Sequence, residues 1–270
     1  MKVLTQMNFM KAIEFVNKLR TQGRYFFTSE EAEKALSLNK MATINTLRRL
    51  RLNKLIVSPA RGFYLIVVPE YQILGCLPAD MFITDLMKYL NLPYYVGFLS
   101  AAQYYGAAHQ KPQRFQVVTS KNRPPILCGR IYIEFIANKN VAIMPTKNFN
   151  TYTGIINVAT PEVLSADIVT MPQHAAGISN VATVLMELAE KIEIQKLSEL
   201  TKINTELPWL QRLGYLLEFL GFNQLANNVA KIIISKKLHW TRLVSNAKYK
   251  PILRDKKWKI IVNTKVEPDE

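Results

Sequence analysis

The residue types that carry out nucleophilic, acid–base or metal chemistry are few and scattered in this sequence. The three histidines, His109, His174 and His239, form no His-x-x-x-His pair, and the two cysteines, Cys76 and Cys128, cannot supply a zinc site. A Cys128–His109 nucleophile pair has no support from spacing. We therefore expect no catalytic residue, no metal site and no cofactor.

Phosphate loops and paired carboxylates are equally missing from the pattern. None of the ten glycines lies in a glycine-rich phosphate loop, and Gly-x-x-x-x-Gly-Lys-Ser/Thr does not occur. Between residues 71 and 184 the acidic residues are dispersed: Asp80, Asp85, Glu134, Glu162 and Asp167. A metal site or an acid–base pair in this region would have to be formed from these five dispersed residues, so the sequence argues against an enzyme.

Basic residues are the functional signal that remains. The 270-residue chain has a formal net charge of +15, which favours a polyanionic partner. Residues 1–70 hold twelve Lys/Arg against five Asp/Glu, and residues 39–62 hold six basic residues and no acid. A surface of this kind matches the phosphates of a nucleic acid.

The acid-free segment predicts a recognition helix that starts near Lys40. At 100° per residue, Ile44, Leu47 and Leu50 share one face, which we expect to pack on the core. The opposite side and its flanks carry side chains that can reach base edges or phosphates. Together with Arg61, at the tip of a following hairpin, the predicted DNA-binding residues are Lys40, Asn45, Thr46, Arg48, Arg49 and Arg61.

A second basic stretch, residues 231–259, contains ten Lys/Arg and only Asp255 as an acid. Its candidate residues for a partner or nucleic-acid surface are Lys236, Lys237, Lys256 and Lys257. Lysines interleaved with aromatic side chains could hold nucleic acid by charge and stacking, or an acidic protein partner. The alternative is a solvated face with Trp240 and Trp258 buried behind it.

The elements around these residues predict an α+β fold with an N-terminal winged helix-turn-helix domain. Helical spacing over residues 9–19 ends at Gly23, and a short helix follows the cap at Thr28. The recognition helix and two strands, at 55–57 and 63–68, complete the order of a winged helix. This domain is expected at residues 1–70, followed by a connector at Pro69–Pro78 across which packing signals lapse.

Residues 75–270 are expected to form a mixed α/β domain with a small sheet and a mainly helical C-terminal half. The predicted strands are 115–119, 131–135, 155–159 and a closing strand at 258–262. The predicted helices are 81–90, 96–105, one that opens at Thr160-Pro161-Glu162, and then 180–193, 196–203, 208–220 and 223–234.

The remaining composition indicates a cytoplasmic protein without a membrane partner. The N-terminus lacks the apolar core of a signal peptide, and no run of about 18 uncharged apolar residues could span a bilayer. Two distant cysteines favour buried thiols in a reducing compartment over a disulfide framework.

Three segments resemble the AbiEi family of antitoxins from bacterial abortive-infection toxin–antitoxin systems. The first is the helix Ala42–Leu50 with the wing motif Arg61-Gly62-Phe63-Tyr64. The second is Leu99–Gly106 followed by the strand Phe115–Thr119, and the third is Leu210–Glu218. The family often has histidine before the glycine of the second segment, where this chain has Tyr105.

The resemblance implies two functions. The N-terminal domain would bind inverted repeats in double-stranded operator DNA and repress its own operon, and the C-terminal domain would counteract a nucleotidyltransferase-like toxin, directly or indirectly. Two other readings stay open. One is a ligand-responsive winged-helix transcription factor without a toxin partner, and the other is an enzyme that acts on nucleic acid through residues 231–259. From the residues alone, Arg212-Leu213-Gly214-Tyr215 is a helix-packing motif in which Gly214 permits close approach of a neighbouring helix.

Overall fold

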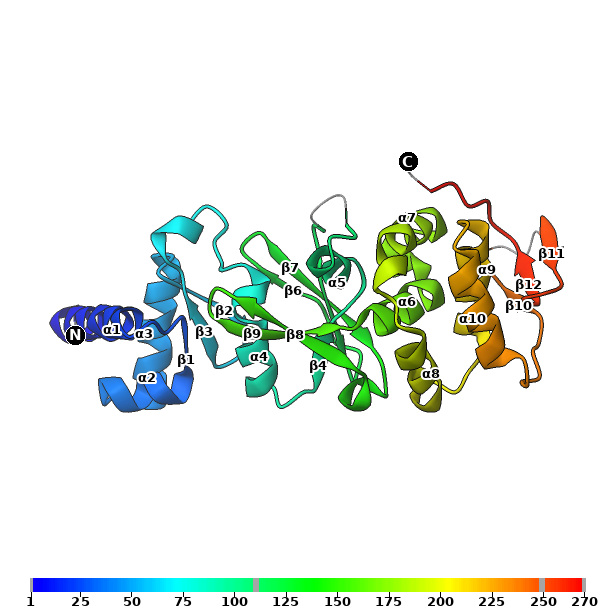
Figure 1. Ribbon diagram of the computed structural model, residues 1–270. Coiled ribbons are helices and arrows are strands. Elements are labelled where there is room, and N and C mark those ends of the chain that lie inside the picture. Colours follow the sequence, from blue (N-terminus) through cyan, green and yellow to red (C-terminus); the bar gives the residue numbers. More distant parts are fainter. Residues whose placement is uncertain (1, 109–111, 248–250, 269–270) are drawn as a thin grey trace. The chain divides into compact units, whose positions relative to one another are not determined.

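The computed structural model describes residues 2–108, 112–247 and 251–268, and its α+β architecture divides into two compact units (Figure 1). The first unit comprises residues 1–93, 122–135 and 150–156, and the second comprises residues 94–121, 136–149 and 157–270. The first unit therefore takes in two later segments besides the N-terminal part of the chain.

A winged helix forms the N-terminal part of the first unit. Its elements are α1 (Lys2–Thr21), β1 (Phe26–Thr28), α2 (Ser29–Leu36), α3 (Lys40–Leu52), β2 (Ile56–Ala60) and β3 (Phe63–Ile66). The three strands form an antiparallel sheet in the order β1-β3-β2. The predicted helices and hairpin are confirmed, whereas the three-residue strand β1 was not expected.

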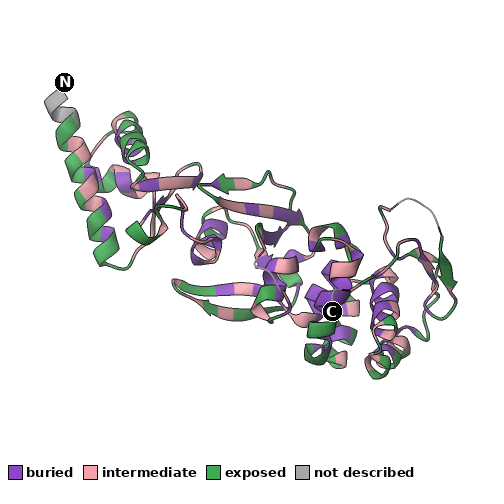
Figure 2. Cartoon of the chain, turned by 90° about the horizontal axis from the view of Figure 1, so that it is seen from above, coloured by how far each residue is buried: buried purple, intermediate pink, exposed green. Residues whose placement is uncertain are grey.

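Apolar side chains from every element of the winged helix meet in one core. Its buried members are Ala12, Val16, Leu19, Phe27, Ala32, Leu36, Leu47, Leu50, Ile56 and Ile66. The ring of Phe27 contacts Phe15 edge-on, with centroids 5.2 Å apart, and stacks on Tyr64 at 5.4 Å. This core holds α3 against α1 and α2, so one side of α3 remains for solvent (Figure 2).

The expected connector at Pro69–Pro78 is packed and is not a free linker. Cys76 and Leu77 are fully buried, and the backbone N–H of Arg130 donates to the carbonyl of Leu74 at 2.7 Å. At Gly129 an added Cβ would lie 2.1 Å from the Leu74 oxygen, so only glycine allows this backbone approach. Residues far along the chain complete this contact, so the segment packs as part of the first unit.

Complete elements in the rest of the first unit are η1 (Pro69–Tyr71), η2 (Ala79–Met81), α4 (Ile83–Tyr89) and β6 (Ile126–Cys128), and parts of three further strands also belong to it. The compact units thus divide the chain differently from the domains expected at 1–70 and 75–270. The independent folding of residues 1–70 stays a prediction.

One sheet in the described part of the chain has six strands, in the order β6-β7-β5-β4-β9-β8. The strands beyond β6 are β4 (Tyr94–Val96), β5 (Phe115–Thr119), β7 (Ile131–Ala137), β8 (Thr146–Thr151) and β9 (Gly154–Ala159). Strand β4 pairs antiparallel with β5 and parallel with β9. The strands predicted at 115–119, 131–135 and 155–159 are confirmed.

Strands β4, β6 and β8 of this sheet were not expected from the sequence. The helix expected at 96–105 begins only at Phe98, because Val96 belongs to β4 and lies opposite Val117 and Val158 in the sheet. Strand β8 is mostly polar and exposed, so it lacks the apolar alternation by which a strand is recognised.

Helices dominate the second unit after the sheet. They are α5 (Phe98–Tyr104), α6 (Pro161–Thr170), α7 (Ile178–Leu188), α8 (Ile194–Ile203), α9 (Pro208–Phe219) and α10 (Asn223–Ile233), with short turns η3 (Val141–Ile143), η4 (Pro172–Ala175) and η5 (Ala189–Lys191). The expected cap of α6 is confirmed, since Thr160 accepts from the N–H of Val163 and Pro161 occupies the first turn. Helix α6 is buried along almost its whole length and packs on α7, α8 and α9.

A small C-terminal sheet in the order β10-β12-β11 follows α10. Its strands are β10 (Thr241–Arg242), β11 (Leu253–Asp255) and β12 (Ile260–Val262), of which only the last was predicted. The ring of Trp258 packs against α9 at Gly214, where an added Cβ would lie 2.0 Å from a ring carbon. The predicted close approach at Gly214 is confirmed, but its partner is an indole and not a helix.

No helix among the described residues is long and apolar enough to cross a membrane.

Candidate nucleic-acid interface

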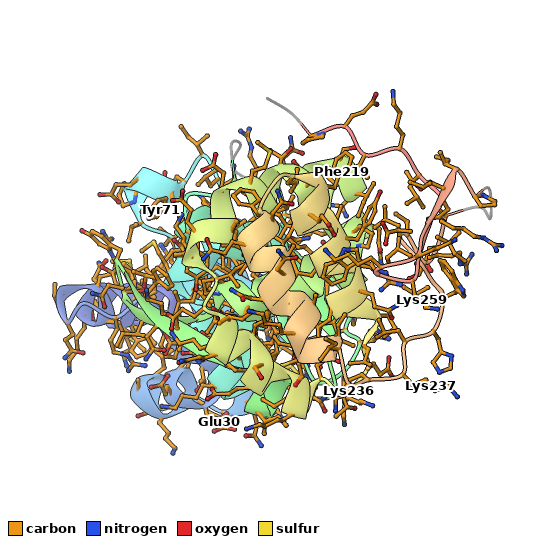
Figure 3. All side chains as sticks on the ribbon, turned by 45° about the vertical axis from the view of Figure 1, so that its right-hand side comes forward. Glu30, Tyr71, Phe219, Lys236, Lys237 and Lys259 are labelled. Atoms are coloured by element: carbon orange, nitrogen blue, oxygen red, sulfur yellow. The ribbon has the colours of Figure 1, made fainter. Side chains whose placement is uncertain are left out.

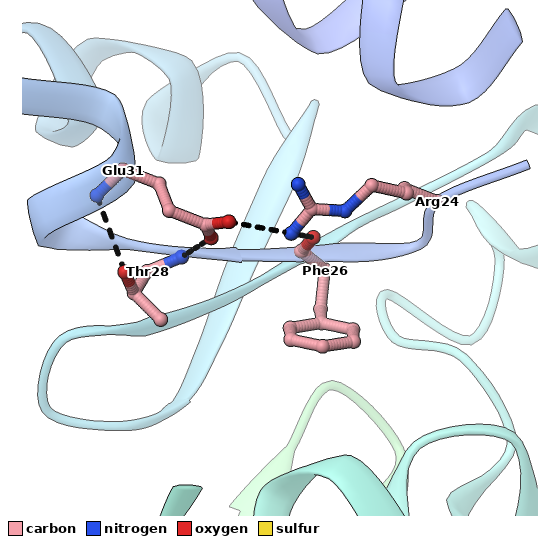
Figure 4. Close-up of polar contacts among 4 residues, drawn as sticks. All are labelled: Arg24, Phe26, Thr28 and Glu31. Carbon is pink, nitrogen blue, oxygen red and sulfur yellow. Dashed lines mark hydrogen bonds and ion pairs between the residues drawn. The ribbon is translucent and has the colours of Figure 1, made fainter. Parts of the chain in front are cut away.

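The helix-turn-helix is anchored by a capping box at the start of α2 (Figure 4). The N–H of Glu31 donates to Thr28 Oγ1 at 3.2 Å, and the N–H of Thr28 donates to Glu31 Oε2 at 2.8 Å. Arg24 Nη2 donates to Glu31 Oε1 at 2.8 Å and to the carbonyl of Phe26 at 3.3 Å. One carboxylate therefore ties the helix end, strand β1 and the segment after α1 together.

The turn between α2 and α3 is set by two short polar residues. Ser37 has left-handed backbone angles of φ 53° and ψ 42° and ends α2. Asn39 then caps α3, because its Oδ1 accepts from the N–H of Ala42 at 2.9 Å. These local bonds fix the angle at which α3 leaves the turn, as a helix-turn-helix requires.

The buried side of α3 is formed by Thr43, Thr46, Leu47 and Leu50. Both threonines satisfy their hydroxyls inside the helix, since Thr43 donates to the Asn39 carbonyl at 3.0 Å and Thr46 donates to the Ala42 carbonyl at 2.8 Å. A threonine whose hydroxyl is bonded within its own helix can be buried without leaving a polar group unpaired.

The side of α3 that faces solvent therefore differs from the side expected from the sequence. Ile44 was placed on the core face but is 45% exposed, and Thr46 was predicted to reach DNA but is 6% exposed. Both assignments of side are corrected by the structure. The exposed side consists of Met41, Ile44, Asn45, Arg48, Arg49 and Leu52, and the apolar members of this set were missed because they fit the core periodicity.

The β2–β3 hairpin places Arg61 at an exposed tip beside α2 and α4. Gly62, with φ +80°, allows the tight turn, and its carbonyl accepts from the N–H of Ser29 at 2.8 Å. The Tyr89 hydroxyl donates to the Arg61 carbonyl at 3.0 Å, and a Cβ on Gly62 would meet that hydroxyl oxygen at 2.5 Å. The wing tip is therefore held by two contacts while its arginine side chain points to solvent.

Together these elements leave an exposed basic surface on the winged helix. All six basic residues of the acid-free segment 39–62 are exposed: Lys40, Arg48, Arg49, Arg51, Lys54 and Arg61. One helix of this surface also presents an amide, at Asn45, that can hydrogen-bond to a base edge. The arrangement can hold phosphates over the helix and the wing and can read bases from α3.

The second basic stretch is less uniform than the sequence suggests. Lys236 and Lys237 are exposed on the segment that follows α10 (Figure 3). Lys257 Nζ is paired with Glu218 Oε1 at 2.8 Å, so part of its charge is neutralised. Trp258 is 1% exposed, as expected for a buried tryptophan, whereas Trp240 is 43% exposed.

The exposed Trp240 ring is flanked by cations. Lys259 Nζ lies 5.4 Å and the Arg254 guanidinium carbon 5.9 Å from its ring centroid. Lys236, Lys237 and Lys256 are exposed in the same unit. The aromatic and basic character of this surface is thus present, but it rests on Trp240, Arg254 and Lys259, which were not among the predicted residues.

The chemically reactive residue types do not assemble into a site within the described ranges. No group of three or more His, Cys, Asp or Glu side chains that could hold a metal ion occurs there. Cys76 and Cys128 are buried free thiols as expected, and a hydrogen bond donated by Cys76 lowers the pKa of the Cys128 thiol. His109 lies outside the described residues, so the structure does not test the nucleophile pair of Cys128 and His109.

Fold and surface together define a two-unit α+β protein with a winged helix-turn-helix at its N-terminus. The family model of the AbiEi antitoxin C-terminal domain matches residues 95–219. This match supports an AbiEi family antitoxin. The second unit contains most of the matched region.

The fold itself is similar to that of a solved structure. The crystal structure of the RV2827C protein from Mycobacterium tuberculosis aligns with a TM-score of 0.69 and 17% sequence identity, covering 93% of this chain and 90% of that one. At this identity the likeness concerns the fold alone. A comparison with curated proteins finds no match.

Proposed function

We propose that this antitoxin binds double-stranded operator DNA of its own operon through α3 and the β2–β3 wing, and thereby represses it. The observation that carries the proposal is the exposed face of α3, where Asn45, Arg48 and Arg49 are exposed within a segment that has no acidic residue. Asn and Arg are the side chains that read adenine and guanine in the major groove.

The packing of α3 supports this function because the residues that hold the helix in the fold are different from those that would contact DNA. Leu47 and Leu50 are almost fully buried and hold the helix, while the exposed arginines make no contribution to the core. Met41 and Ile44, 67% and 45% exposed, would contact thymine methyl groups or the sugar edge of the groove.

The second half of the proposal concerns the toxin. The region matched to the AbiEi antitoxin C-terminal domain would counteract a nucleotidyltransferase-like toxin, directly or indirectly. The second unit also exposes Lys236, Lys237, Lys256 and Trp240, which lie C-terminal to the matched region. We expect neutralisation of the toxin to depend on these residues.

Binding of the full-length chain to its own promoter duplex tests the DNA half of the proposal. Fluorescence anisotropy across several salt concentrations should show log K falling with log[salt] at a slope of roughly −4 to −5 per monomer, for about four to six phosphate contacts. Asn45→Ala and Arg48→Ala should each weaken specific binding about tenfold or more.

The matched control is the pair Lys236→Ala and Lys237→Ala, which removes exposed charge from the second unit. It should leave operator affinity within about twofold, because these lysines are not on the winged helix. Equal affinity for a scrambled duplex, or an Arg48→Ala variant that binds like wild type, would show that α3 does not read this DNA.

A ligand-responsive regulator is a second candidate function, and one observation favours it. The second unit contains a cavity of about 700 Å³ lined in part by Tyr105, Phe149 and Glu162, which is the size of a small-molecule site. An operator affinity that changes with a small ligand, together with no toxin gene beside this one, would select this function over the antitoxin repressor.

A further inference from the structure

The cavity of about 700 Å³ lies wholly within the second unit, inside the region of the chain where the sheet meets the helices. It is bounded by the end of α5, the first half of β8, the start of α6 and helix α8. Residues far apart in sequence, such as Tyr104, Phe149 and Lys196, come together there.

The lining of this cavity includes the buried carboxylate of Glu162, and one of its two oxygens lacks a hydrogen-bond partner among the described residues. Glu162 is 2% exposed, and its Oε1 accepts from the backbone N–H of Glu193 at 2.9 Å. Its Oε2 is buried and has no hydrogen-bond partner among the described residues. A buried carboxylate oxygen without a donor is costly. The second oxygen therefore points to a ligand that donates to it.

Aromatic rings form the apolar wall beside this carboxylate. The rings of Tyr104 and Tyr105 lie 5.2 Å and 5.5 Å from that of Phe149, and the Tyr105 hydroxyl is fixed by donating to the Ala159 carbonyl at 2.7 Å. Burial and the charge of Glu162 raise the pKa of Tyr105, so its phenol stays neutral at physiological pH. Neutral rings beside a buried carboxylate favour an organic cation, and the other two carboxylates of the lining, Glu193 and Glu199, are exposed.

The lysines that line the cavity do not take this role. Lys196 Nζ is bonded to Glu193 Oε1 at 2.6 Å, and Lys191 Nζ donates to the Glu187 carbonyl at 3.1 Å. Lys147 Nζ lies 5.5 Å from the ring centroid of Phe149. All three are exposed, whereas Glu162 is buried, so its carboxylate is the buried charge of the cavity lining.

We propose that this cavity binds a small organic molecule that carries a primary ammonium group, with Glu162 Oε2 as the acceptor and the rings of Tyr105 and Phe149 against its apolar part. A single spare oxygen matches one N–H donor of an ammonium, whereas a guanidinium fork prefers both carboxylate oxygens. The site is separate from the winged helix and does not rest on DNA binding.

The test uses the full-length chain with phenethylamine as the probe and 2-phenylethanol as its neutral counterpart. Titration followed by NMR should show that the amine binds in the millimolar range or tighter, and at least about tenfold more tightly than the alcohol. Intermolecular NOEs from the probe should reach the rings of Tyr105 and Phe149.

Two variants locate the charge and the ring. Glu162→Gln keeps an acceptor for the Glu193 N–H and should abolish the preference for the amine. Phe149→Leu, on the half-buried ring of β8, should weaken binding of both probes severalfold and remains informative if Glu162→Gln does not fold. Glu206→Gln makes the same charge change at an exposed position outside the cavity and should leave the affinity within about twofold.

The proposal is overturned if the alcohol binds as tightly as the amine, if Glu206→Gln and Glu162→Gln lower the affinity equally, or if neither probe binds in the millimolar range. If no amine binds, but Glu162→Gln removes binding of the toxin, the cavity receives a protein side chain and the small-molecule assignment is wrong.

Discussion

Gly214→Ala should destabilise the second unit, although alanine is the better helix former. Gly214 lies inside α9, and an added Cβ would lie 2.0, 2.2 and 2.6 Å from three carbons of the Trp258 ring. The helix propensity of alanine would stabilise α9 by about 1 kcal/mol. Overpacking of a core costs about 1–3 kcal/mol, and loss of a buried tryptophan about 3–5 kcal/mol.

The ring has little freedom to move away from the new methyl group. Trp258 Nε1 donates to Glu218 Oε2, Trp258 N donates to Asp255 Oδ1 at 2.8 Å, and the Trp258 carbonyl accepts from Gln211 Nε2 at 2.8 Å. The cost should therefore lie near the upper end of the range. After subtracting the helix propensity gain, we expect a net loss of about 2–4 kcal/mol.

Urea unfolding followed by tryptophan fluorescence measures this loss in the second unit alone, because Trp209, Trp240 and Trp258 all belong to it. Since the variant alters that fluorescence through Trp258, far-UV circular dichroism serves as a second probe. In a Trp258→Leu background, Gly214→Ala should be neutral or slightly stabilising, since the clash is gone and the propensity gain remains. A Gly214→Ala protein as stable as wild type would refute the close packing of α9 on this ring.

Three further predictions separate the functions and the buried charge of the chain. Replacing three exposed arginines of the winged helix, Arg48, Arg49 and Arg61, by alanine should abolish repression in a promoter reporter while leaving rescue from the toxin largely intact, because exposed side chains add little to stability. Loss of rescue in that variant, with the protein folded and abundant, would show that the two activities are not separable. Neutralising Lys236, Lys237, Lys256 and Lys257 should weaken rescue and spare repression. The smallest effect should come from Lys257, because it is paired with Glu218. Unchanged growth on co-expression with the toxin would identify these lysines as a solvated face. Burial raises the pKa of Asp167 from 3.8 to about 7, so between these values the native protein keeps a proton that the unfolded chain releases, and stability should fall as pH rises through this window. Asp167→Asn should remove that slope, on the order of 4 kcal/mol at most, and a variant with the same pH profile as wild type would contradict the assignment.

Local chemistry in the sequence was sufficient to predict the winged helix and most of the later elements. The cap at Thr28, the end of α1 at Gly23 and the turn at Arg61-Gly62 depend on residues within a few positions of one another. Interactions over such short separations form whatever the rest of the chain does, so their signatures survive in the sequence alone. The same holds for Thr160 and Pro161 at the start of α6.

The side of α3 that faces the core was decided by tertiary packing. Periodicity ranked Ile44 as buried and Thr46 as exposed, because it weighs each side chain by its polarity. The structure reverses both, since the Thr46 hydroxyl is satisfied by the Ala42 carbonyl and its methyl can then pack on the core. Periodicity also assigns exposed apolar residues such as Ile44 to the core, because it cannot distinguish them from buried ones.

Contacts between distant segments were equally beyond the sequence. In the sequence, Glu162 is one of several dispersed acidic residues. No neighbouring residue indicates that its carboxylate accepts a hydrogen bond from the Glu193 N–H or shares a cavity with the rings of Tyr105 and Phe149. Gly214 predicted a close approach, but only the fold brought Trp258 to it. Periodicity and capping specify which elements form and where they begin and end, while the cavity and the buried pairs arise from how those elements pack, which depends on side chains tens or hundreds of residues apart.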